Sequence, residues 1–213
     1  MGSKNRFSIT DCDGNDKSQE LEYFVDHIGL KSAAWGRYSL LLVLELYHGM
    51  TSGFLNPSKV VHEINVLEGI EKRSQLKAAA QFQHHPLKGL WHKHYLEDGM
   101  KAVAINLKKG GNKYGMSFFE QRILESKLSG KKIYVSLEDI PLITKDFVDG
   151  NWARMANAEA LTGEWIVYAQ YQGANYYLCI GKHNSGDQHL RTLIDTLCCQ
   201  EFPFLTGILE NSA

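Results

Sequence analysis

The spacing of apolar residues changes after residue 163, and this change constrains the fold more than any other feature of the sequence. The segments EWIVYAQY (164–171) and NYYLCIGKH (175–183) are rich in the β-branched and aromatic residues that favour strands. The residues QGA lie between them, and Gly173 can supply a tight turn. The sequence therefore predicts an antiparallel β-hairpin late in the chain.

The remaining segments have mainly helical periodicity. Helices are expected over 18–29, 32–49, 56–82, 97–109, 117–127, 144–161 and 187–199, with a short strand inside 131–143 and a proline-broken tail at 201–205. Helices first and antiparallel strands late are typical of an α+β protein. We expect a mainly helical N-terminal two-thirds and a C-terminal antiparallel hairpin or small sheet, with 1–17 a flexible polar N-terminus and 18–213 a single domain.

Capping residues indicate where several of these helices begin and end. Asn56 is an expected N-cap, followed by Pro57 at the first helical position, and this helix should end before His85 and Pro86. Ser117 and Glu120 have the spacing of a capping box. The pair Gly110-Gly111 is expected to close the helix that precedes it.

The composition favours a soluble cytoplasmic protein. The longest apolar run, LLLVLELY at 40–47, is far shorter than the roughly 18 residues that span a bilayer, and it contains Glu45. The first ten residues have no apolar stretch of the kind found in secretion signals. The four cysteines form no C-x-x-C pair, so we expect buried or incidental thiols in a reducing compartment.

Charge is distributed unevenly although the net charge is only −1. Residues 72–113 contain nine basic side chains and two acidic ones, a balance of +7, which leaves −8 on the rest of the chain. Residues 11–26 contain six acids and one lysine. Such asymmetry can attract an anionic partner, so nucleic acid or another phosphate-bearing ligand is expected, and a protein partner is an alternative.

Two further motifs resemble ion-binding segments. The acidic segment from Asp11 to Glu22 matches several ligand positions of a calcium loop, but Asp16 stands where the sharp turn requires glycine, which favours a solvated turn. The segment KKGGNKYG (108–115) is expected to be a basic glycine loop before the helix at Ser117. Its backbone N–H groups and lysines could contact phosphate, although it lacks a nucleotide-binding consensus.

The segment HHPLKGLWHKHYLEDG (84–99) holds four of the nine histidines and is the expected functional surface. If residues 90–96 are extended, His92 and His94 share one face and Lys93 lies opposite. If they are helical, Lys88 and His92 share a face, as do Trp91 and Tyr95.

Three interpretations of this segment remain open. The imidazoles could perform general acid–base cleavage of a phosphodiester, in the manner of a metal-independent ribonuclease, with no cofactor. They could instead belong to a non-enzymatic binding surface or a structural connection, or the pair with His84 or His85 could hold zinc. For the first interpretation the candidate catalytic residues are His92, His94, Lys88 and His85, and the candidate binding residues are Lys93, Trp91, Tyr95, Lys108, Lys109 and Lys113.

Overall fold

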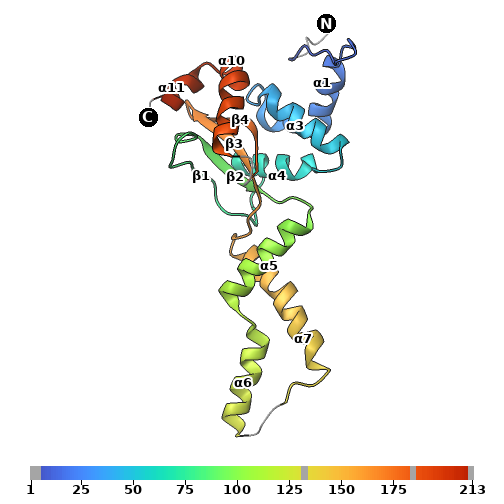
Figure 1. Ribbon diagram of the computed structural model, residues 1–213, viewed down its shortest axis with the longest axis vertical. Coiled ribbons are helices and arrows are strands. Elements are labelled where there is room, and N and C mark those ends of the chain that lie inside the picture. The colour runs from blue at the N-terminus through green and yellow to red at the C-terminus, as the bar shows by residue number, and fades with distance from the viewer. Residues whose placement is uncertain (1–5, 131–133, 183–185, 211–213) are drawn as a thin grey trace. The chain divides into compact units, whose positions relative to one another are not determined.

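The computed structural model describes residues 6–130, 134–182 and 186–210 (Figure 1). The chain divides into two compact units. The sheet unit comprises Met1–Ser74, Ala78–Asp98 and Gly163–Ala213, and the helical unit comprises Gln75–Lys77 and Gly99–Thr162. The expectation of a single domain over 18–213 stays a prediction.

The sheet unit is built on an antiparallel sheet that, within the described residues, has four strands in the order β1-β2-β3-β4. They are β1 (Ala80–Gln81), β2 (Trp91–Tyr95), β3 (Glu164–Tyr171) and β4 (Ala174–Gly181). The predicted hairpin is confirmed as β3 and β4, and positive φ angles at Gln172 (51°) and Gly173 (79°) form its turn. The predicted α+β class is therefore confirmed, and the sheet gains two strands from the region of the histidines.

One face of the sheet packs against four helices: α1 (Ser18–His27), α2 (Leu30–Ala34), α3 (Leu40–Thr51) and α4 (Pro57–Leu67). The strands contribute Tyr95, Ile166, Tyr168 and Tyr177 to this core, all nearly or fully buried. Ser39 caps α3, and the predicted cap of α4 by Asn56 is confirmed, because its side chain accepts a hydrogen bond from the Ser58 backbone N–H.

The opposite face packs against the C-terminal helices. These are α9 (Asp187–Leu193), the π-helical segment η2 (Ile194–Cys198), α10 (Cys199–Glu201) and α11 (Phe204–Glu210). Strand residues Val167, Ala169 and Cys179 meet Leu190, Ile194, Cys198, Phe202, Leu205 and Leu209 in this second core. Cys179 and Cys198 are buried thiols here, whereas Cys12 is exposed.

The helical unit contains α5 (Met100–Tyr114), α6 (Ser117–Ser129), α7 (Asp139–Lys145), the π-helical segment η1 (Asp146–Gly150) and α8 (Asn151–Asn157). Asn106 links α5 to the end of this unit, since its amide donates to the Thr162 carbonyl at 2.8 Å and its carbonyl accepts from the Thr162 N–H at 2.9 Å. Within the described ranges, no helix of the chain is long and apolar enough to span a bilayer.

Two of the predicted helix bounds are wrong, because glycines with positive φ end the helices earlier than expected. The expected helix at 32–49 is two helices, because Gly36 takes a φ of 73° and Ser39 N–H then bonds the Tyr177 carbonyl of β4 at 2.9 Å. The expected helix at 56–82 ends at Leu67, where Gly69 has a φ of 72°.

Residues 108–115 were expected to form a loop, and this prediction is also wrong. Gly110 and Gly111 continue α5, because their missing side chains allow close packing: a Cβ on Gly111 would lie 2.7 Å from the Phe147 ring. Ser117 makes no capping bond to its helix. The strand expected within 131–143 falls partly outside the described residues, and 134–136 are not strand.

Lys93 forms an ion pair with Glu63 inside the sheet unit. The Lys93 Nζ lies 3.1 Å from Glu63 Oε2, the two side chains are 3% and 4% exposed, and Ser74 bonds to both. Replacing either partner alone should lower the free energy of unfolding by about 3–5 kcal/mol, because it leaves a buried charge uncompensated. The variants Lys93→Met and Glu63→Leu, measured by urea unfolding, test this.

The double variant provides the control. Lys93→Met combined with Glu63→Leu should be clearly less destabilised than either single change, since neither charge of the pair then remains. Lys88→Met, at an exposed lysine, should change stability by less than about 0.5 kcal/mol. Equal and additive losses from the two single variants would contradict the pairing.

Candidate functional site

The histidines lie on an extended strand, which resolves the two alternatives left open by the sequence. In β2, His92 and His94 project to the face covered by the C-terminal helices, whereas Trp91, Lys93 and Tyr95 project to the face covered by α1–α4. β2 pairs in full with β3, from Trp91 opposite Tyr168 to Tyr95 opposite Glu164. This pairing holds the two imidazoles two residues apart on one side of the sheet.

The two imidazoles are neighbours within a cluster of aromatic rings. The ring centroids of His92 and His94 are 5.6 Å apart, and His92 lies 4.6 Å from Phe82 and 5.4 Å from Trp165. His92 is partly exposed and His94 is 6% exposed. The pair therefore lies at the margin of the second core, with His92 nearer to solvent.

The orientation of His94 is fixed by the backbone. Its Nδ1 lies 2.7 Å from the Gly163 carbonyl oxygen and 3.4 Å from the Gly163 backbone nitrogen. Because the carbonyl oxygen can only accept and makes the shorter contact, the geometry favours a proton on Nδ1 and a basic nitrogen at Nε2. Gly163 is required at this approach, because a Cβ there would lie 1.8 Å from the Tyr95 carbonyl oxygen. A contact from one ring nitrogen to a backbone carbonyl is a common feature of histidines that accept protons at the other ring nitrogen.

The other candidates from the histidine segment lie in the connection between β1 and β2. His84, His85 and Lys88 are all exposed there. Arg191 of α9 holds this connection, since its Nη1 donates to the Pro86 carbonyl oxygen at 2.9 Å. The sheet unit thus presents exposed cationic and imidazole groups on the segment that leads into His92.

Three candidate binding residues occupy the opposite face of β2. Lys93 is buried in its pair with Glu63, Tyr95 is 1% exposed, and Trp91 packs partly buried against the first core. The structure does not bring these side chains together with the imidazoles. Lys108, Lys109 and Lys113 are exposed on α5 of the helical unit, on a helix and not on the loop expected for them.

A pocket in the sheet unit was missed by the sequence analysis. It has a volume of about 270 Å³ and lies among α3, β2, β4 and α9. Its lining residues are Glu45, His48, Gly49, Phe54, Leu55, Tyr95, Glu97, Ile180, Lys182, His189, Leu190 and Leu193. The available signal was Glu45 itself, a carboxyl group within the apolar run LLLVLELY. An apolar helix tolerates such a group when it has a partner or a function.

Burial controls the protonation states of Glu45 and Tyr95, which line this pocket. Burial raises the pKa of Glu45 to about 8, although the Ile180 N–H, which donates to Glu45 Oε2 at 2.6 Å, and Lys182 act in the opposite direction. Burial also raises the pKa of Tyr95, with a smaller effect from Glu97, Glu164 and Glu45. At pH 7 the Glu45 carboxyl is mostly protonated and the Tyr95 phenol is neutral.

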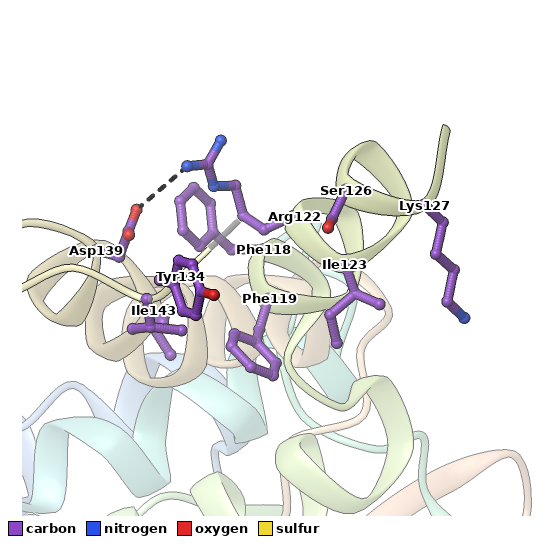
Figure 2. A pocket seen from close by; sticks show the side chains of 10 residues that line it. Phe118, Phe119, Arg122, Ile123, Ser126, Lys127, Tyr134, Asp139 and Ile143 are labelled. Atoms are coloured by element: carbon purple, nitrogen blue, oxygen red, sulfur yellow. Dashed lines mark ion pairs between the residues drawn. The ribbon is translucent and has the colours of Figure 1, made fainter. Parts of the chain in front are cut away.

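The helical unit has a pocket of its own, between α6 and α7 (Figure 2). Its volume is about 260 Å³, and its walls are mainly apolar and aromatic, including Phe118, Phe119 and Ile143. The one ion pair drawn across it joins Arg122 and Asp139 at 3.8 Å. No residue of α6 or α7 is buried, so this part of the unit exposes much apolar surface.

The chain matches no known family model, no curated protein and no solved structure. Within the ranges that the structure describes, no three His, Cys, Asp or Glu side chains form a group that could hold a metal ion. His183, which the sequence places close to the end of β4, lies outside those ranges. Function is therefore inferred from the side chains of the two sites in the sheet unit.

The protonation of Glu45 predicts a dependence of stability on pH. Because its folded pKa is raised from 4.5 to about 8, the native state keeps a proton that the unfolded chain loses. This contribution is fully present below pH 4.5 and is lost as the pH rises to about 8. Wild type should therefore lose up to about 5 kcal/mol relative to Glu45→Gln between these limits. The measurement is the free energy of urea unfolding of both proteins as a function of pH, and parallel profiles would contradict this prediction.

Proposed function

We propose that this protein cleaves RNA without a metal ion, by acid–base chemistry at His92 and His94. The observation that carries the proposal is the pair of adjacent imidazoles, 5.6 Å apart, one of which is oriented by a 2.7 Å contact from its Nδ1 to the Gly163 carbonyl oxygen. Two positioned imidazoles supply the base and the acid that phosphodiester cleavage requires at neutral pH. His92 is partly exposed, which gives this imidazole access to a substrate, and His94 lies beside it at 6% exposed.

The proposed reaction is an internal transfer. One imidazole removes the proton of the ribose 2′-hydroxyl, and the 2′-oxygen forms a bond to phosphorus as the bond from phosphorus to the 5′-oxygen breaks. The second imidazole donates a proton to that leaving oxygen, so the products are a 2′,3′-cyclic phosphate and a 5′-hydroxyl. The basic Nε2 suits His94 to the role of base, and His92 then serves as the acid.

Neighbouring side chains support RNA as the substrate. The Phe82 and Trp165 rings beside His92 can stack on an unpaired base. Exposed Lys88 and His85 precede the strand, and their charge can attract phosphate and stabilise the extra charge of the transition state. Exposed Lys108, Lys109 and Lys113 of the helical unit add sequence-independent attraction for the RNA backbone.

All four cysteines are unpaired thiols, which supports the proposal that the protein acts in the reducing cytoplasm. The alternative function is non-enzymatic binding of RNA, of another anionic ligand or of a protein by the same surface. A second alternative is zinc binding through the histidines, which elemental analysis of the purified protein tests directly. A content of near one zinc ion per chain would favour zinc binding over the acid–base proposal.

The test is cleavage of single-stranded RNA at low salt in the presence of a chelator. Wild type should yield 2′,3′-cyclic phosphate ends. His92→Gln and His94→Asn should each lower the rate roughly a hundredfold or more, because each removes a proton-transferring nitrogen. The Asn amide can still donate to the Gly163 carbonyl, so His94→Asn retains the contact that orients the side chain.

Two matched variants separate chemistry from binding. His27→Gln changes an exposed histidine on α1 and should leave cleavage unchanged. Lys109→Gln with Lys113→Gln should weaken RNA binding and reduce its salt dependence while cleavage persists at saturating RNA. RNA that is bound but remains intact in wild type would favour the binding function. RNA that is neither bound nor cleaved would exclude both.

A further inference from the structure

The pocket at Glu45 combines an apolar wall with a few polar groups, which is the composition of small-molecule sites. Leu55, Ile180, Leu190 and Leu193 supply aliphatic wall, and Phe54, 79% exposed, supplies an aromatic ring. The volume of about 270 Å³ admits a ligand of small size. Tyr95 lines this pocket, whereas His92 and His94, which project to the other face of β2, do not.

The Tyr95 hydroxyl provides an independent indication of a ligand. Tyr95 is 1% exposed and lines the pocket, yet its hydroxyl has no hydrogen-bond partner within the described residues. A buried hydroxyl left in this state costs about 1–3 kcal/mol. A ligand atom that accepts or donates a hydrogen bond at this position would remove that cost.

The charges around this hydroxyl are negative. Tyr95 interacts electrostatically with the carboxyl groups of Glu97, Glu164 and Glu45. Glu97 and Glu45 also line the pocket. An anionic ligand at this position would be repelled by the Glu97 and Glu164 carboxylates, whereas a cation would be attracted by them, and by Glu45 once that carboxyl has lost its proton.

The other titratable groups around Glu45 come from every element of the pocket wall. His48 lies on the same helix, Lys182 follows β4, and His189 lies on α9, and all three are exposed. The buried thiols of Cys179 and Cys198 also interact with the Glu45 carboxyl. Apart from Lys182, the positive charge at the pocket depends on protonation of the two histidines.

We propose that the pocket lined by Glu45, Tyr95 and Glu97 binds the ammonium group of a small organic amine, with the apolar part of the amine against Leu55 and Ile180. The ammonium ion donates to the Glu45 carboxylate and to the Tyr95 phenol oxygen, which gives the buried hydroxyl oxygen a hydrogen-bond partner. Phe54 can contact the same ligand through a cation–π or ring contact.

Proton release is the signature of this mode of binding. The Glu45 carboxyl, with a pKa of about 8, must lose its proton to form the ion pair. An alkylammonium ion keeps its charge to about pH 10, so deprotonation of the amine itself contributes little to the pH dependence of binding. Affinity should therefore rise roughly tenfold per pH unit between pH 6 and pH 7, with nearly one proton released per amine at pH 7.

The experiment is titration calorimetry of the full chain with 2-phenylethylammonium as the probe. The probe should bind, and 3-phenylpropionate and 2-phenylethanol, which match it in shape without the positive charge, should bind at least tenfold more weakly. Repeating the titration at pH 7 in buffers of different ionisation enthalpy should give close to one proton released. Amine binding no tighter than that of the carboxylate, or binding without proton release, would overturn the proposal.

Three variants test the named residues. Glu45→Gln should weaken amine binding at least tenfold and abolish the proton release, and Tyr95→Phe should weaken it severalfold. His48→Gln with His189→Gln should retain both the binding and its dependence on pH. If Glu45→Gln binds the amine as wild type does, the pocket does not act through this carboxyl and the proposal fails.

Glu201→Gln is the matched control. Glu201 is also a carboxyl whose pKa is raised by burial, and it accepts a bond from the Leu40 N–H at 2.8 Å, but it does not line the pocket. This variant should bind the amine unchanged. The binding measurement in wild type needs no RNA, so its outcome is independent of whether His92 and His94 cleave RNA.

Discussion

The pairing of β2 with β3 is the constraint on which both candidate sites depend. Along β2 successive side chains alternate between the two faces of the sheet, so one register places His92 and His94 together and sends Lys93 and Tyr95 to the other side. The buried pair of Lys93 with Glu63 stabilises this choice, because a shift by one residue would move a lysine into an aromatic cluster and remove the partner of a buried carboxylate.

The parts of the fold with strong local signals were predicted from the sequence. The hairpin at 164–181 could be predicted, because β-branched and aromatic residues flank a turn that requires positive φ. The sequence of β2 is compatible with both a strand and a helix, because WHKHY is short and has no β-branched residue. Its conformation is determined by β3, whose residues lie about seventy positions later in the chain. Gly110 and Gly111 have the local signature of a helix end, and only their close packing against residues far along the chain, such as Phe147, explains why the helix continues through them.

The candidate sites also contain parts that local sequence patterns predict and parts that they do not. The grouping of His92 with His94 follows from the period of a strand and was one of two stated alternatives. Lys93 was counted within the basic segment, since its neutralising partner Glu63 lies thirty positions earlier and on another element. The pocket at Glu45 assembles residues from α3, β2, β4 and α9, and no local pattern in the sequence joins them. The one local signal for this pocket is the Glu45 carboxyl within an otherwise apolar run.

The cysteines have a practical consequence for chemical labelling. Burial raises the pKa of Cys179, Cys198 and Cys199, so these thiols hold their protons and form little of the nucleophilic thiolate. Cys12 is exposed, in the sheet unit, outside both candidate sites. A maleimide dye would therefore attach preferentially at one position of the natural sequence. That single attachment point would give a fluorescence signal from the folded chain with every histidine and carboxylate discussed above left in place.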